Sequence, residues 1–144
     1  MTVRIFETPL TSVTVDTNIM AAGDALGAQL SLEVPDSGII KAILITDVDD
    51  EAGTTQNVWF FRSQPAVIAT NAAFALADAD LEKVIANRLI NDEFDAINGR
   101  VRYEECNIPY RTDGGLLWLQ LENAAGTPTY AAATNIKIKL FIEW

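Results

Sequence analysis

Polar and apolar residues alternate along several stretches of the chain, and this period of two predicts β-strands. The clearest example is 135–144, where every second residue is apolar. Residues 26–34 and 116–122 alternate in the same way. One face of each strand is therefore expected to pack on a core, with the other face turned toward solvent.

Two nearly continuous apolar runs lie near the middle of the chain, at 39–48 and 58–61. Both are rich in β-branched or aromatic residues and are bounded by turn signals, which is typical of buried strands. We therefore expect 38–62 to form one hairpin at the core of the protein. Leu44 lies within the first run, so aspartate at this position is expected to unfold the domain.

Turn signals and one short helical segment divide the rest of the chain. A tight hairpin is predicted at Asn98 and Gly99. Asp78 is expected to cap one or two helical turns. Residues 84–90 suit either a helix or a strand, and we favour the strand.

Together these elements predict an all-β fold, an antiparallel β-sandwich or jelly roll of about eight strands with one short helix. A parallel α/β fold is disfavoured, because it would need helices of about 10 to 15 residues between the strands. A single domain is expected over 1–144, since no linker or repeat interrupts the chain. Residues 1–10, interrupted at Thr8 and Pro9, are expected to form either an extended arm or an edge strand.

The composition supports a globular domain. Of the 144 residues, 49% are hydrophobic and 21% are charged, and a chain of this length can fold with no disulfide or metal. No run approaches the ~20 apolar residues of a membrane span, so no membrane partner is expected. Residues 1–9 lack the features of a secretory signal, and synthesis in a cytosol is expected.

Acidic residues outnumber basic residues by twenty to ten, which gives a formal net charge of −10. Such a charge opposes binding to a phosphate backbone, and no basic run offsets it. We therefore expect no nucleic-acid partner. The same charge favours solubility and docking on a basic surface.

The residue types on which most catalytic sites depend are missing. Histidine is absent, which excludes histidine-activated nucleophiles and the common zinc sites. Cys106 is the only cysteine, and with no histidine to activate it we expect an unreactive thiol, either buried or in a loop. The protein is therefore expected to be no enzyme and to use no cofactor.

One group of carboxylates has the spacing of a possible calcium site. Asp47, Asp49 and Glu51 are spaced as at the start of an EF-hand loop, yet Ala52 and Val58 stand where that loop needs glycine and glutamate. A solvated loop tip, whose charge also blocks edge pairing, is the favoured interpretation, and no metal site is predicted.

A second group of carboxylates could suggest a glycosidase pair. Such an enzyme needs one carboxyl held neutral in an apolar cleft, and nothing in the sequence brings two of these residues together. A helix N-terminus and loop charges are the favoured interpretation. The group consists of Asp78, Asp80, Glu82, Asp92, Glu93 and Asp95.

Three aromatic residues, Trp59, Trp118 and Phe141, fall opposite the better-filled face of their strands. An aromatic row of this kind can bind sugar, anchor a protein interface or form a second core layer. Core packing is favoured for Trp59, within its apolar run. For Trp118, which shares its face with Gln120 and Glu122, an interface and a core position are equally open.

Part of the chain resembles small structural proteins of tailed bacteriophages. In that pattern a hydrophobic strand ends in an acidic turn, an aromatic strand follows, and a segment Asn-Ala-Ala-Phe-x-Leu-x-Asp-Ala-Asp comes next. Here the three parts lie at 37–50, 59–61 and 71–80. The closing strand, with Ile-Lys-Ile-Lys-Leu, is consistent with the pattern and less specific.

The resemblance implies a non-enzymatic virion structural protein with a β-sandwich fold that decorates or cements the major capsid lattice. Its implied partners are the major capsid protein and further copies of itself, in a homo-oligomer. Its implied location is the virion, after synthesis in the host cytoplasm. Linked subunits would gain affinity by engaging several capsomers at once.

The predicted partner interface consists of Val3, Arg4, Ile5 and Phe6 of the N-terminal arm, together with Trp118. An extended arm can add a strand to a neighbour's sheet. The alternative, an ordinary edge strand of the same domain, is equally open. A second functional hypothesis is a carbohydrate- or partner-binding β-sandwich module of a phage tail or fibre.

Overall fold

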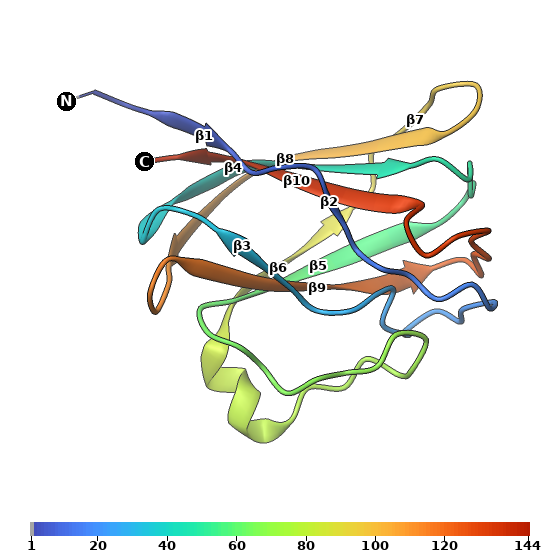
Figure 1. Ribbon diagram of the computed structural model, residues 1–144, viewed down its shortest axis with the longest axis horizontal. Helices are drawn as coiled ribbons and strands as arrows, with labels where there is room; N and C mark the ends of the chain where they lie inside the picture. The colour runs from blue at the N-terminus through green and yellow to red at the C-terminus, as the bar shows by residue number, and fades with distance from the viewer. Residues whose placement is uncertain (1) are drawn as a thin grey trace.

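The computed structural model describes residues 2–144 and consists of two antiparallel sheets packed face to face (Figure 1). The larger sheet has six strands, in the order β1-β10-β4-β8-β7, with β2 also pairing to β10. The smaller sheet has four strands, in the order β3-β9-β5-β6. The predicted all-β sandwich is therefore confirmed.

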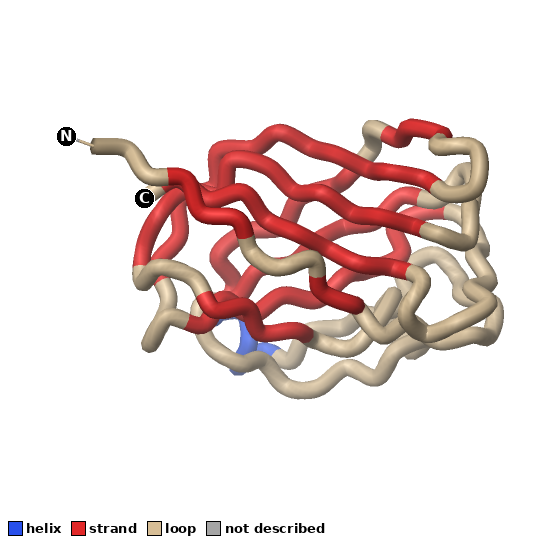
Figure 2. The backbone as a smooth tube through the Cα atoms, turned by 45° about the horizontal axis from the view of Figure 1, so that its top comes forward, coloured by secondary structure: helices blue, strands red, loops and turns tan. Residues whose placement is uncertain are grey.

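Residues 2–144 contain ten strands and one short 3₁₀ helix, η1 (Asp78–Lys83). The count exceeds the expected eight because the ten include three very short strands. These are β1, β2 and β7, with two or three residues each. Figure 2 shows the strands crossing the molecule, with several loops gathered at one end and another long loop running along one side. No helix in this part of the chain is long and apolar enough to cross a membrane. The strands are β1 (Ile5–Glu7), β2 (Thr11–Ser12), β3 (Leu30–Glu33), β4 (Ser37–Asp47), β5 (Thr55–Phe61), β6 (Val84–Ile90), β7 (Glu93–Asp95), β8 (Arg100–Arg111), β9 (Leu116–Ala125) and β10 (Ile136–Glu143).

The core lies between the two sheets and is formed by alternate residues of both. Every second residue of β10 and the first half of β9 is completely buried, as the alternation predicted. Burial of apolar surface contributes about 25 cal/mol per Å² and is the main stabilising term. The inward residues of these two strands are Ile136, Ile138, Leu140 and Ile142, and Leu117, Leu119 and Leu121.

The predicted hairpin of 38–62 is wrong. β4 lies between β10 and β8 in the larger sheet, whereas β5 lies between β9 and β6 in the smaller sheet. The connection 48–54 carries the chain from one sheet to the other. Consecutive apolar strands can pair edge to edge or face each other across a core, and their apolar pattern is the same in both arrangements. Both strands are nevertheless central to the core.

Leu44 faces out of the core. Ile43 and Ile45 are completely buried, whereas Leu44 is only partly buried, beside Tyr103 and Lys139 of the adjacent strands. Successive residues of a strand point to opposite faces, so a continuous apolar run cannot place all its members in one core. The prediction that Leu44 is a core residue is therefore wrong.

Two local predictions hold with changes of detail. Helical turns followed by a strand are found as η1 and β6, but the cap position is Ala77 and Asp78 is the first helical residue. β7 and β8 form the predicted hairpin, and its loop closes with a 2.8 Å bond from Ala96 N to Gly99 O. Glycine is required at 99, because a Cβ there would lie 2.7 Å from the carbonyl oxygen of Asp47.

The N-terminal segment is in part an edge strand of its own domain. β1 pairs with β10, and two 3.0 Å backbone bonds between Arg4 and Trp144 extend this pairing. The two chain ends therefore lie side by side (Figure 1). Between β1 and β2, the hydroxyl of Thr8 accepts the N–H of Leu140 at 2.9 Å. Of the two open interpretations, the edge strand applies to β1.

Candidate functional site

The N-terminal corner of the larger sheet holds most of the predicted partner interface. Val3 and Ile5 are 57% and 64% exposed, and Trp144, the backbone partner of Arg4, is 50% exposed. The guanidinium of Arg4 lies 5.2 Å from the ring centroid of Trp144, a cation–π geometry. We call the exposed apolar group of Val3, Ile5 and Trp144 the terminal patch.

Phe6 points away from the terminal patch. It is partly buried and packs against the core, because its side chain lies on the opposite face of β1 from that of Ile5. Phe6 instead lines a groove between the β1–β2 segment of the larger sheet and β3 of the smaller sheet. It therefore lies on a different face of the arm from Val3 and Ile5.

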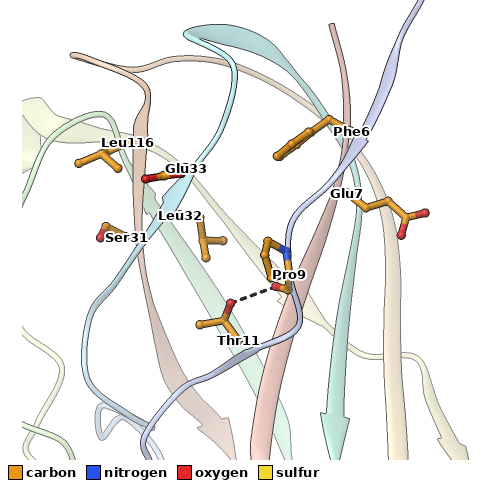
Figure 3. Close-up of a pocket in the computed structure, with 8 residues that line it drawn as sticks. All are labelled: Phe6, Glu7, Pro9, Thr11, Ser31, Leu32, Glu33 and Leu116. Carbon is orange, nitrogen blue, oxygen red and sulfur yellow. Dashed lines mark hydrogen bonds between the residues drawn. The ribbon is translucent and has the colours of Figure 1, made fainter.

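The groove lies at one lateral edge of the sandwich and has a volume of about 550 Å³. In Figure 3 the side chains of Phe6, Pro9 and Leu32 border the space between the two segments. Glu7 and Glu33 point away from this space on opposite sides (Figure 3). The groove thus has an apolar interior with a carboxylate on each flank.

The opposite lateral edge of the sandwich is bridged by side chains. Arg88 of β6 and Glu104 of β8 form an ion pair with a 2.8 Å separation, and Arg88 also donates to the carbonyl oxygen of Glu105 at 3.3 Å. On the groove side, the backbone link between the two segments is a 3.2 Å bond from Ala28 N to Val13 O, beyond the end of β2. The sandwich is therefore more open along β1 and β3.

Trp118 is separate from the terminal patch. It lies on the outer face of the smaller sheet, partly buried, with Ser31 of β3 and Phe61 of β5 as its register partners. The terminal patch belongs to the larger sheet. The structure therefore does not bring the five predicted interface residues into one site.

The expected aromatic row is divided between the two sheets. Trp59 lies on the smaller sheet and stacks on Phe74 with ring centroids 5.5 Å apart, so it packs in a second layer as favoured. Phe141 lies on the larger sheet, edge-on to Tyr103 at 6.4 Å. Phe141 is therefore separate from Trp118, whereas Phe61 and Trp59 of β5 share the outer face of the smaller sheet with Trp118.

Residues 62–77 cover part of the outer face of the smaller sheet. Besides the contact between Phe74 and Trp59, the side chain of Gln120 donates to the carbonyl oxygens of Gly27 and Ile68 at 2.8 and 2.9 Å. Gln120 is almost completely buried by these contacts. The long connection is thus fastened to the sheet by polar and aromatic contacts.

The acidic loop after β4 is anchored by a buried carboxylate. Asp47 is 1% exposed and accepts the N–H groups of Asp49 and Glu51 at 2.9 and 3.2 Å. Its Oδ2 lies 3.4 Å from Nη1 of Arg102, which also pairs with Glu93 at 3.1 Å. The interpretation of this loop as solvated charge is therefore wrong for Asp47.

Other carboxylates of the loop accept hydrogen bonds from the protein itself. Asp49 Oδ2 accepts the N–H of Ala131 at 2.7 Å, and Glu51 Oε1 accepts the N–H of Thr129 at 3.2 Å. Throughout residues 2–144, no group of three or more acidic or thiol side chains is arranged to hold a metal ion. These carboxylates fasten the loop to the segment before β10.

Arg102 is the principal residue that the sequence patterns missed. Its side chain is 1% exposed and donates to the carbonyl oxygen of Glu51 at 2.8 Å and to Thr54 Oγ1 at 2.7 Å. The alternation of β8 was a usable signal, because Arg102 and the buried Cys106 fall on the same inward face. A charged residue at such a position needs a buried partner.

Two members of the second group of carboxylates, Asp80 and Glu93, lie in separate ion pairs. Asp80 accepts the N–H of Ala66 at 2.9 Å and pairs with Lys83 at 2.8 Å. The hydrogen bond from Lys83, followed by that from Ala66, lowers the pKa of Asp80. Glu93 instead pairs with Arg100. Neither arrangement sets one carboxyl against another, as a glycosidase pair requires.

Cys106 lies buried in β8, not in a loop. Its thiol lies 3.3 Å from the carbonyl oxygen of Ile40, and burial raises the pKa of this thiol. The thiolate is the reactive form of cysteine, so a raised pKa lowers the reactive fraction at neutral pH.

Comparison with known proteins adds no family to this description. No protein-family model matches the chain, and comparisons with curated proteins and with solved structures find no match either. The terminal patch and the groove are the surfaces from which a function can be inferred.

Proposed function

We propose that the protein is a non-enzymatic virion structural protein that decorates or cements the major capsid lattice of a tailed phage. Its partners are the major capsid protein and further copies of itself, in a homo-oligomer located in the virion. The resemblance of 37–50, 59–61 and 71–80 to such proteins supports this role. These segments form β4 with its acidic loop, the aromatic end of β5 and the connection that leads into η1.

The observation that carries the proposal is an exposed apolar patch beside a free strand edge. β1 has β10 on one side only. Because Arg4 and Trp144 exchange backbone hydrogen bonds, the alternation of an antiparallel ladder directs the N–H and C=O groups of Ile5 and Glu7 away from β10. An edge of this kind can pair with a strand of another protein.

The charge and the fold suit attachment in many copies. A net charge of −10 favours a basic surface on the partner. The sandwich supports the terminal patch on a paired strand, so little chain entropy is lost when the patch binds. Contacts that are weak singly become strong when an oligomer engages several capsomers.

Binding to capsids that lack the protein tests this role. Ile5→Lys is expected to lower the bound fraction in co-sedimentation, because a charge on an edge strand opposes edge pairing. Ile19→Lys is the matched control, since Ile5 and Ile19 are each 64% exposed and Ile19 lies in a loop. Equal binding by both variants and wild type would contradict the role of the terminal patch. No binding by wild type would contradict decoration itself.

A carbohydrate- or partner-binding module of a phage tail or fibre is the second candidate. The partial exposure of Trp118 on the outer face of the smaller sheet favours it, since accessible aromatic side chains anchor interfaces. A glycan array that compares wild type with Trp118→Ala separates the two candidates. Glycan binding that is lost in Trp118→Ala would favour the binding module over the capsid protein.

A further inference from the structure

The groove between the β1–β2 segment and β3 is a surface distinct from the terminal patch. We propose that it binds an extended peptide segment by adding a strand to β3, and that this segment alternates basic with apolar side chains. The occupant is thus defined by its chemistry, whether or not the protein is a virion component. Three features support this assignment, namely a free strand edge, an apolar space and flanking carboxylates.

The free edge belongs to β3, which has β9 on one side and no strand of residues 2–144 on the other. The N–H of Val34 donates to the C=O of Gly115 at 3.0 Å, and β3 pairs with β9 in that register. Hydrogen-bonded and non-hydrogen-bonded pairs alternate in an antiparallel ladder. The N–H and C=O groups of Ser31 and Glu33 therefore point to the free edge, where an added strand can bond to them.

The space beside this edge can receive apolar side chains. Its volume of about 550 Å³ lies within the ~300 to 1,000 Å³ typical of ligand sites. Leu32 of β3 is 4% exposed, and Phe6 packs on the same core from the other segment. Figure 3 shows both side chains, with Pro9, at the border of the space. A side chain opposite Leu32 would enter these apolar surroundings.

The carboxylates beside the groove favour a bound peptide segment with basic side chains. Glu33 and Glu7 are exposed and point away from the interior on opposite sides (Figure 3). Glu7 already pairs with Lys139 at 3.2 Å, so the preference for a basic occupant rests on Glu33. On an added strand, the side chains opposite Ser31 and Glu33 would lie on the outer face of the smaller sheet, beside the Glu33 carboxylate. Opposite charges on neighbouring strands attract, and like charges repel. Basic residues are therefore favoured at alternate positions of the occupant.

A second copy of this chain matches the groove less well than a basic segment. The edge strands of a second copy are β1 and β7 of the larger sheet and β3 and β6 of the smaller sheet. None of these four strands has basic residues at alternate positions.

A short peptide that alternates valine with lysine is the probe, and fluorescence anisotropy measures its binding to the complete protein. Methylation of alternate peptide nitrogens removes the donors from one edge of the peptide, and methylation of the other nitrogens gives a matched control. Strand addition predicts that one methylated peptide binds about tenfold more weakly while the other binds like the parent. Equal affinity of the two methylated peptides would overturn the proposal.

Charge reversal tests the selection of basic residues. Glu33→Lys is expected to weaken binding of the valine–lysine peptide about fivefold and to favour a valine–glutamate peptide. Glu105→Lys is the control, since Glu105 is also exposed but lies on β8, away from the groove. Wild type that shows no preference for the valine–lysine peptide would overturn the proposal. So would self-association of wild type that Glu33→Lys abolishes.

Discussion

Arg102 and Asp47 face each other inside the sandwich, with 3.4 Å between Nη1 and Oδ2 and with side chains 1% and 0% exposed. They come from β8 and β4, which are neighbours in the larger sheet. Arg102 also donates to Thr54 and to the carbonyl oxygen of Glu51. A buried charge with no partner is far more costly than a paired one. Each residue is therefore tolerated in the interior because the other is present.

This pairing predicts that Arg102→Met lowers the free energy of unfolding by about 3 to 5 kcal/mol, because Asp47 stays buried with no counter-ion. Urea denaturation measures the loss. Arg88→Met, which removes the more exposed pair with Glu104, is the control and is expected to cost about 1 kcal/mol or less. The double variant Arg102→Met with Asp47→Asn is expected to lose less free energy of unfolding than the sum of the losses of the two single variants. Equal losses in Arg102→Met and Arg88→Met would contradict the pairing.

The alternation along β4 predicts a large difference between adjacent residues. Ile43→Ala is expected to lower the free energy of unfolding by about 2 to 5 kcal/mol, because it leaves a cavity in the core. Leu44→Ala, on the partly exposed outer face, is expected to cost roughly 1 kcal/mol. Chemical denaturation of both variants measures the difference. A larger loss in Leu44→Ala than in Ile43→Ala would contradict the observed facing of β4.

The strands could be predicted from the sequence where one face is apolar and the other polar, as in β9 and β10. The pairing of β4 and β5 could not, because an apolar run has no period that separates a hairpin from two facing strands. For the same reason, the sequence did not show that the side chain of Leu44 points out of the core. The local sequence pattern therefore predicted the strands more reliably than it predicted which strands pair with each other.

The candidate surfaces were predictable only in part. Val3 and Ile5 were identified because an N-terminal alternation interrupted by Pro9 indicates an edge or an arm. The groove could not be predicted, since it arises where Phe6 and Leu32, far apart in the chain, approach across two sheets. The buried contact of Asp47 likewise depends on the register of β4 against β8.

The hydrogen bonds of the Gln120 side chain are expected to hold the segment 62–77 against the smaller sheet. Gln120→Leu leaves two carbonyl oxygens with no donor and is expected to cost about 1 to 3 kcal/mol, with faster hydrogen exchange in that segment. Gln29→Leu is the control, because the contacts of Gln29 with Pro65 and Ala66 are longer, at 3.4 Å. Hydrogen exchange that is unchanged in Gln120→Leu would contradict this role.

Asp80 is expected to contribute to acid unfolding. The hydrogen bond from Lys83 lowers the pKa of Asp80 below its ordinary value of 3.8, so the unfolded chain binds this proton at a higher pH than the folded protein does. The stabilisation is therefore complete above the ordinary pKa and is lost as the pH falls below 3.8 through the folded value.

Thermal melting of wild type and Asp80→Asn between about pH 6 and about pH 2 measures this contribution. The difference in Tm is expected to be constant at the higher pH and to shrink below pH 3.8. The exposed Asp78 of the same helix supplies the control variant, Asp78→Asn. A Tm difference between wild type and Asp80→Asn that persists unchanged to the lowest pH would contradict the stabilising role of this carboxylate.

The buried thiol of Cys106 is expected to react with a thiol reagent at least ~100-fold more slowly in the folded protein than in denaturant, since reaction requires local opening. Absorbance of the released thiolate measures both rates. An exposed thiol introduced by Ala96→Cys in a Cys106→Ser background is the control and is expected to react quickly in the folded state. Equal folded and unfolded rates for Cys106 would contradict its burial.

Mass analysis of purified virions whose genome encodes this chain tests the proposed role most directly. Capsid decoration predicts that the chain is present in many copies per particle, in a fixed ratio to the major capsid protein. It also predicts that particles lacking the chain are less resistant to heat. Virions that contain no copies of the chain would contradict the role.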